Sequence, residues 1–407
     1  SACACGERGV TGAGEALRPV CVCLSLCGMF GAIRRHTGDR EGPRKIFPTG
    51  FHANAQLIAR SAVRDNPPPQ DPLLVTDAFE RQKFDKLRRY MDSDELVHRI
   101  RSLAGLLELL DASQGNTILA LRYDLVPVVC ARAADPDVDA RDMALRALAQ
   151  MTRPLRGFEE LRVDTRVHEA LLQGIQDEES CVRESAHFLA RALAERDEGI
   201  STLVKIDYLR GAVAACFEDP EVNVKCAALF ALAACLVSES GTKYALRYRL
   251  IECVQELLSN YDCGDVVRLA AECLELISVS SDAKLRAIRC GCVPSLFAHM
   301  VPEQVSERAL DHVSGALMNL SIENDGKHAC EDPEFLRAIL VALETVDPSR
   351  TGCVTNLLRL VSNLSENPKC RQVLVTGTSI VEEYCNQEDS RVVEVAVDAL
   401  ERVTWSA

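Results

Sequence analysis

The residues best suited to chemistry are the 19 cysteines and eight histidines of this 407-residue chain. Cysteine pairs hold zinc when two or more residues separate them, yet no CxxC occurs, and the CGC of Cys290 to Cys292 is too tight for such a site. Cys3, Cys5, Cys21, Cys23 and Cys27 have no histidine at ligand spacing. Many of the others fall within helical runs, where cysteine behaves as a small core hydrophobe. We expect free thiols in a reducing compartment and no metal site.

Catalytic motifs are also missing from the sequence. It contains no P-loop, GxSxG or HExxH, and GVTGAGEA at Gly9 to Ala16 lacks the strand–turn–helix context of a dinucleotide fingerprint. His168, His187, His312 and His328 are far apart along the chain, as surface or core histidines would be. We therefore expect no catalytic residues, no cofactor and no small-molecule substrate, and we predict that the protein is not an enzyme.

The elements that position these side chains repeat about every 42 residues. Leu317 lies in an apolar helix followed by a polar turn, SGALMNLSIENDGK, and LLRLVSNLSENPK from Leu357 echoes it. Small residues recur one helical turn before most of the matching core positions, as expected where helices approach closely. The core positions are Leu106, Leu148, Leu189, Leu232, Leu274, Leu317, Val361 and Leu400, and the small residues are Ser102, Ala144, Ser185, Ala228, Ala270 and Ala396.

Acidic residues in the loops form a second ladder with the same period. Four of them adjoin a proline, which favours turns and helix starts. Two independent ladders with one period indicate a repeat architecture, in which each unit buries its apolar face against its neighbours. The acidic residues are Asp135, Asp177, Asp219, Asp262, Glu303, Asp347 and Asp389.

Composition narrows the classes of partner. The net charge is −14, which argues against nucleic acid, because phosphate binding needs a basic face. The apolar run Val20 to Ala32 is too short to span a bilayer, and its nearest basic residues follow it, on the wrong side for a secretory signal. We expect protein partners, without nucleic acid or membrane.

Three segments are expected along the chain. Residues 1–50 are interpreted as a disordered or mis-assigned tail. Residues 51–76 read as an extended, proline-rich arm or linker, since they carry the triple proline Pro67 to Pro69 and no helical period. Residues 77–407 carry the repeats, each with a short, a medium and a long helix; Lys243 to Arg249 and Leu250 to Ser259 illustrate the first two.

This three-helix pattern resembles that of armadillo repeats. GCVPSLF (Gly291 to Phe297) and GALMNLS (Gly315 to Ser321) are similar to the signatures of the family's second and third helices. HEAT repeats share the period but have two helices per unit, and the short first helix argues against them. The resemblance implies an all-α, right-handed superhelical solenoid of about seven to eight units, with a terminal half-unit ending in ERVTWSA.

In the armadillo family the third helices line a concave groove in which an asparagine ladder holds an extended peptide. Only Asn319 and Asn363 match the ladder, and either could instead cap its own helix. No tryptophan stands one turn earlier, so a nuclear-import receptor is disfavoured. The candidate partner-binding residues of the groove are Arg146, His187, Arg191, Phe230, Asn319, Arg359 and Asn363.

The repeat count and two further stretches, Asp77 to Leu110 and Gly315 to Cys330, resemble the radial spoke head 14 family of armadillo proteins. That resemblance implies a structural role among radial-spoke and microtubule-doublet proteins in the axoneme of a cilium or flagellum. Two alternatives remain open at the level of sequence: a cytosolic adaptor that binds a linear peptide of a soluble partner, and a regulatory subunit of a larger complex.

Overall fold

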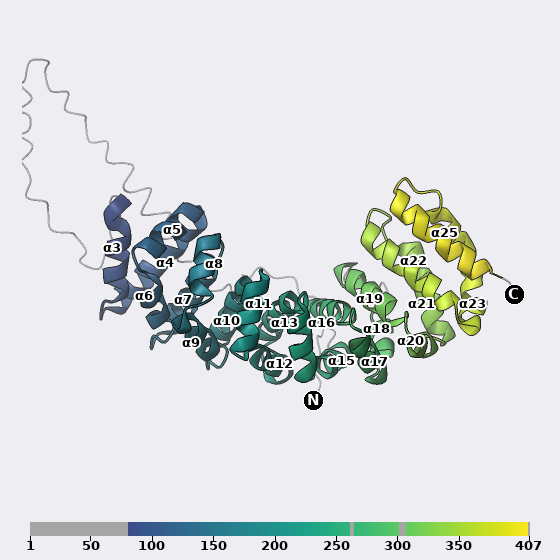
Figure 1. Ribbon diagram of the computed structural model, residues 1–407, viewed down its shortest axis with the longest axis horizontal. Helices are drawn as coiled ribbons and strands as arrows, with labels where there is room; N and C mark the ends of the chain where they lie inside the picture. Colours follow the sequence, from purple (N-terminus) through teal and green to yellow (C-terminus); the bar gives the residue numbers. More distant parts are fainter. Residues whose placement is uncertain (1–79, 261–263, 301–306, 406–407) are drawn as a thin grey trace, which may run out of the picture. The chain divides into compact units, whose positions relative to one another are not determined.

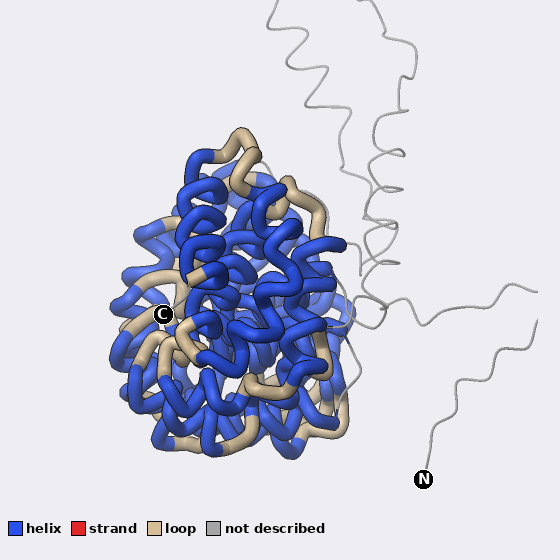
Figure 2. The backbone as a smooth tube through the Cα atoms, turned by 90° about the vertical axis from the view of Figure 1, so that its right-hand side faces the viewer, coloured by secondary structure: helices blue, strands red, loops and turns tan. Residues whose placement is uncertain are grey.

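The computed structural model describes residues 80–260, 264–300 and 307–405, all within one compact unit that spans Leu73–Ala407. Helices and connecting turns make up these residues, with no strand among them, which confirms the predicted all-α armadillo solenoid (Figures 1 and 2). The expected tail (1–50) and arm (51–76) lie outside the described residues.

The helices follow one another as repeated triplets after an initial pair, α3 (Glu80–Met91) and α4 (Leu96–Ala112). The first helices are α5 (Gln114–Arg122), α8 (Leu155–Leu161), α11 (Asp197–Lys205), α14 (Glu239–Arg247), α17 (Ser281–Arg289), α20 (Asn324–Ala329) and α23 (Pro368–Leu374). The second helices are α6 (Val126–Arg132), α9 (Thr165–Gly174), α12 (Tyr208–Glu218), α15 (Leu250–Asn260), α18 (Cys292–Phe297), α21 (Pro333–Thr345) and α24 (Thr378–Tyr384), the last preceded by the 3₁₀ turn η1 (Val375–Gly377). The third helices are α4 and then α7 (Val138–Met151), α10 (Ser180–Leu193), α13 (Val222–Leu236), α16 (Gly264–Ile277), α19 (Glu307–Leu320), α22 (Thr351–Ser365) and α25 (Ser390–Thr404).

The sequence predicts an incomplete repeat unit at the C-terminal end, but the structure has it at the N-terminal end of the described residues. Helices α23, α24 and α25 form a full triplet, and within the described range the partial unit is the pair α3 and α4. The short α23 completes the last triplet because Asn367 caps it, accepting a hydrogen bond from the Lys369 amide, and Pro368 occupies its first position.

Each third helix packs against the next, and the core lies along this row. Leu106, Leu148, Leu232, Leu274 and Leu317 are all fully buried, as their period predicted. Small residues between them, such as Ala144 and Ala228, let neighbouring helices approach closely.

Arginine–aspartate pairs link the first units at the N-terminal ends of their third helices. Arg141 Nε and Nη2 lie 2.8 and 2.9 Å from the two carboxylate oxygens of Asp177 in the next unit. Arg183 binds Asp219 in the same way, at 2.6 and 3.0 Å, and Arg99 binds Asp135 at 2.8 Å. Such two-pronged charge-assisted pairs are stronger than neutral hydrogen bonds. Three of the loop acids identified by their period, Asp135, Asp177 and Asp219, therefore hold successive units together.

The same arginines also fix the loops before their own helices. Arg141 Nη1 donates to the Asp135 carbonyl at 3.0 Å, and Arg183 Nη1 donates to the Asp177 carbonyl at 2.8 Å. The loops at Asp135 and Asp177 are thus each bound by two arginines. The arginine of the preceding third helix binds the aspartate, and the arginine of the following third helix binds the backbone carbonyl groups.

These pairs show that the repeat register predicted for α10 from the sequence is wrong by one residue. Because Arg141 and Arg183 play the same part 42 residues apart, Ala190 rather than Leu189 corresponds to Leu148, and Ala186 rather than Ser185 corresponds to Ala144. Leu189 and Ala190 are both fully buried, so apolar pattern alone could not distinguish them.

We expect Arg141→Ala to lower the free energy of unfolding by about 2–3 kcal/mol, because the half-buried Asp177 carboxylate loses a two-pronged partner. Arg141→Lys keeps the charge but not the planar fork, and should lose part of that energy. The matched control is Arg156→Ala, which removes an exposed pair with Glu160 and should cost about 0.5 kcal/mol or less. Urea unfolding followed by circular dichroism measures all three; equal losses for Arg141→Ala and Arg156→Ala would contradict the linking role.

Candidate functional site

The two ladder asparagines join neighbouring third helices. Asn319 Nδ2, on α19, donates to the Glu275 carbonyl at 3.0 Å and to Ser278 Oγ at 3.2 Å, at the C-terminal end of α16. Asn363 Nδ2, on α22, donates to the Met318 carbonyl at 3.2 Å and to Ser321 Oγ at 2.9 Å, at the end of α19. Both amides therefore cap the helix of the preceding unit rather than their own.

This arrangement limits how the asparagines can bind a partner. Carbonyl groups in the last turn of a helix have no partner within the helix, so an amide from the next unit satisfies them. The Nδ2 donors of Asn319 and Asn363 are used in this way, and each side chain is half-buried. Their amide oxygens remain as acceptors for a partner's N–H groups.

His187 lies in the core and not on the third-helix face. Its side chain is fully buried, and its Nδ1 lies 2.7 Å from the Tyr208 hydroxyl on α12. Burial lowers the pKa of His187 to about 4, so the ring is neutral at physiological pH. Its inclusion among the groove residues followed from the one-residue register error in α10.

The corrected register places Phe188 on the face instead. Phe188 and Phe230 occupy equivalent positions in α10 and α13, and their side chains are 41% and 37% exposed. The Arg191 guanidinium carbon lies 4.8 Å from the centre of the Phe230 ring, a cation–π contact, and a weaker ion pair joins Arg191 to Glu195 at 4.0 Å. We call Phe188, Arg191 and Phe230 the aromatic patch; it suits an apolar or aromatic side chain of a partner.

Arg146 and Arg359 are exposed on other third helices. Arg146, on α7, lies 3.5 Å from Asp142 of its own helix. Arg359, on α22, lines a surface pocket of about 660 Å³ between α22 and α25, together with Asn356 and Asp398. Of the seven predicted groove residues, His187 is thus buried, and the other six lie on α7, α10, α13, α19 and α22 and stay candidates for contact with a partner.

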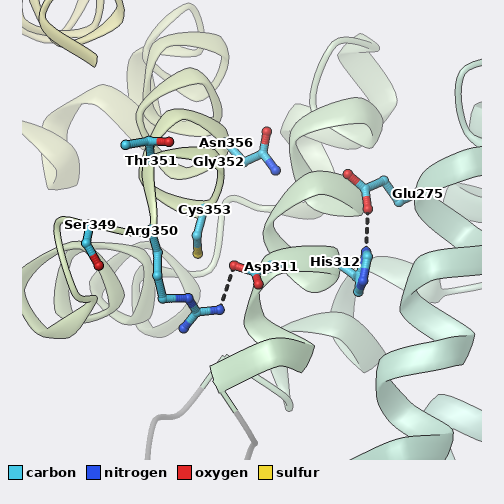
Figure 3. A pocket seen from close by; sticks show the side chains of 9 residues that line it. All are labelled: Glu275, Asp311, His312, Ser349, Arg350, Thr351, Gly352, Cys353 and Asn356. Atoms are coloured by element: carbon cyan, nitrogen blue, oxygen red, sulfur yellow. Dashed lines mark hydrogen bonds and ion pairs between the residues drawn. The ribbon is translucent and has the colours of Figure 1, made fainter. Parts of the chain in front are cut away.

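A second pocket, of about 400 Å³, adjoins this one and lies among α16, α19 and α22 (Figure 3). Two interactions form its charged wall: His312 Nδ1 lies 2.8 Å from Glu275 Oε2, and Arg350 Nη2 lies 2.6 Å from Asp311 Oδ1. Asn356 lines both pockets and so connects them. Polar and charged side chains of both signs make this region suitable for polar segments of a protein.

Gly315 allows the side chains of Glu275 and Asn356 to approach each other over α19. A Cβ atom at this position would lie 2.1 Å from Glu275 Oε1 and 3.1 Å from Asn356 Nδ2. Any larger residue would push these two side chains apart. The sequence alone could not predict that Glu275 and Asn356, which belong to the two neighbouring units, converge on Gly315.

The described cysteine thiols are free, and burial keeps many of them protonated. The 13 described cysteines are free thiols and most are buried, as expected; burial raises the pKa of Cys235 and Cys292 to about 12. Across residues 80–260, 264–300 and 307–405, no three His, Cys, Asp or Glu side chains gather in a way that could hold a metal ion. None of the helices in these ranges is long and apolar enough to cross a membrane.

We expect Asn319→Ala and Asn363→Ala each to lower the free energy of unfolding by about 1–2 kcal/mol, because each leaves a helix end unsatisfied. The two asparagines serve different interfaces, α16–α19 and α19–α22, so the losses should add in the double variant. Asn386→Ala is the control, since Asn386 is exposed and donates only to the Glu382 carbonyl of α24, within its own unit. Thermal unfolding of the four variants tests this, and unchanged midpoints would contradict the capping role.

The His312–Glu275 pair should make stability depend on pH. The hydrogen bond to Glu275 raises the pKa of His312 above its ordinary value, outweighing burial, and Glu272 acts in the same direction. A histidine with a raised pKa in the folded state stabilises the fold fully below its unfolded pKa of about 6.5, and that stabilisation is lost as pH rises through the folded pKa.

The melting temperature of the wild type should therefore exceed that of His312→Gln by more at pH 5.5 than at pH 8.5, with a difference on the order of 2 °C. Calorimetry at both pH values measures this. His328→Gln is the control, because His328 lies on the exposed surface with Glu331 of its own unit. A His312→Gln difference that is the same at both pH values would contradict the assignment.

No protein-family model matches the chain. Radial spoke protein 14 of Chlamydomonas reinhardtii is 26% identical over 353 residues, covering 80% of this chain and 86% of that protein.

Similar solved structures include an engineered protein (TM-score 0.70, 18% identity, 80% of this chain and 79% of that one) and a designed armadillo repeat protein (TM-score 0.52, 17% identity, 57% and 98%). A chain from work on the interaction between cadherin and β-catenin gives a TM-score of 0.62 at 15% identity, covering 79% and 69%. The similarities to solved structures show the fold, whereas the match to Radial spoke protein 14 is a similarity of sequence. The chain thus has an armadillo-repeat fold, and its sequence is similar to that of Radial spoke protein 14.

Proposed function

We propose that this protein is a non-enzymatic structural component of the motile cilium, associated with radial spokes on the microtubule doublets of the axoneme. The observation that carries the proposal is the similarity to Radial spoke protein 14, which runs through 80% of this chain and 86% of that one. The extent of this match supports a shared architecture and a shared role as a scaffold.

The state of the reactive side chains and the groups exposed on the third-helix face support a binding role over a catalytic one. His312 is bound to Glu275, His187 is buried against Tyr208, and buried thiols such as Cys235 are held protonated. The exposed groups are suited to contacts with protein: an aromatic patch on α10 and α13, and two polar pockets among α16, α19, α22 and α25.

The aromatic patch also favours a second candidate function, that of a cytosolic adaptor binding a linear peptide. Its exposed rings and the cation over Phe230 could take an apolar side chain of an extended segment, while the amide oxygens of Asn319 and Asn363 accept from its backbone. In this alternative the third-helix face is essential. In the spoke scaffold, surfaces outside that face should carry the attachment.

Fractionation of the tagged protein in ciliated cells of its own source separates the two functions. We expect it to remain with demembranated axonemes through moderate salt, because a structural subunit is held by several surfaces at once. A protein found wholly in the soluble fraction of the cell body would contradict the proposal.

A variant with substitutions on the third-helix face distinguishes the two candidate functions more directly. Phe188→Ala with Phe230→Ala and Arg359→Ala removes exposed groups of the third-helix face while sparing the asparagines that stabilise the stack. Incorporation into axonemes should be unchanged if the spoke scaffold is correct. Loss of incorporation by this variant, with wild-type stability, would favour binding through the third-helix face.

A further inference from the structure

Three successive units expose a large apolar residue at the same position. Val237, Val279 and Ile322 lie in the turns that follow α13, α16 and α19, and each directly precedes the N-cap of the next first helix. Their exposed fractions are 73%, 73% and 49%. In the flanking units the equivalent residues are Glu195 and Glu366, so the apolar character is confined to these three turns.

A local packing role does not account for these side chains. An apolar residue before an N-cap often packs against the first turn of the helix that follows. Such a contact would cover the side chain, whereas Val237 and Val279 are the most exposed of the large apolar residues in the described ranges. Ser238, the N-cap after Val237, already satisfies the start of α14 by accepting from the Gly241 amide at 3.0 Å.

The three residues form a stripe of regularly spaced positions because the helices that precede them are neighbours. Helix α16 packs against α13 and α19, and Figure 1 shows the three in succession. At the second junction the Asn319 amide reaches Ser278, the residue next to Val279. Packed helices lie about 8–10 Å apart, so the apolar side chains recur at about that interval along the edge of the stack.

Acidic residues accompany the stripe on one side. Glu239, Asp282 and Asp325 lie in the first turns of α14, α17 and α20, and all three are exposed. Lys243 pairs with Glu239 at 2.6 Å and offsets part of this charge. In α17, Lys284 is buried and the other basic residues lie in the last turn, as do those of α20. The stripe is therefore apolar with a mainly acidic border.

We propose that this stripe, Val237–Val279–Ile322 with its acidic border, is a docking site for an amphipathic basic helix of a partner protein. A helix rises 1.5 Å per residue, so apolar side chains seven residues apart recur about every 10.5 Å, close to the spacing of the stripe. Three contacts need about 15 residues, and lysine or arginine beside the apolar positions would face the acids. The inference goes beyond the axonemal role and does not depend on it.

The test uses the full chain and three synthetic fluorescent peptides of about 18 residues. The first carries leucine at every seventh position with lysines beside each leucine, on an alanine background that favours a helix. The second has the same composition but leucines at every fifth position, which scatters them around the helix. In the third, glutamate replaces lysine. Fluorescence anisotropy gives the dissociation constants.

The wild type should bind the first peptide at least about tenfold more tightly than the other two, since only it presents both the apolar spacing and the complementary charge. Val237→Glu with Val279→Glu and Ile322→Glu should weaken that binding by at least about tenfold. Glutamate already stands at this position in two units, as Glu195 and Glu366, so the triple variant should fold, which circular dichroism checks.

The matched control is Leu155→Glu with Val163→Glu, two similarly exposed residues away from the stripe. It adds negative charge as the triple variant does, and should bind the first peptide as well as the wild type or slightly better. Equal binding of all three peptides, or equal loss in the control and triple variants, would overturn the proposal. Concentration-dependent self-association that the triple variant abolishes would instead assign the stripe to a second copy of this chain.

Discussion

Side-chain hydrogen bonds between successive third helices are the constraint on which this structure depends. Each unit has helix ends and loop carboxylates that it cannot satisfy alone. In the first units, arginines such as Arg141 and Arg183 bind the loop aspartate of the next unit. In the last units, Asn319 and Asn363 cap the third helix of the preceding unit. The apolar core supplies most of the driving force, whereas these bonds fix the register in which the units stack.

This constraint decides which surfaces remain for partners. A side chain bound between units is a poor anchor for a partner, because using it would first break a bond of the stack. The exposed groups that remain include the aromatic patch on α10 and α13, the two pockets between α16 and α25, and the apolar edge at Val237, Val279 and Ile322. Separate surfaces on one array suit a protein that joins several components of an assembly.

The sequence predicted the architecture well because a period of about 42 residues appears in two independent sets of positions. It failed at α10, where Leu189 and Ala190 are both apolar, and only the pairing of Arg183 with Asp219 fixes the register. That error replaced the exposed Phe188 by the buried His187. The pocket beside Gly315 was beyond prediction, because Glu275, His312 and Asn356 come from three units and meet only through the stacking geometry.

The most direct measurement of the central claim is electron cryomicroscopy of intact microtubule doublets from the source cells, with the tagged chain located. A structural spoke component is predicted to appear as a helical stack beside a radial spoke, contacted by other proteins at surfaces that include the edge formed by Val237, Val279 and Ile322. Doublets with complete spokes but without this chain would contradict the account.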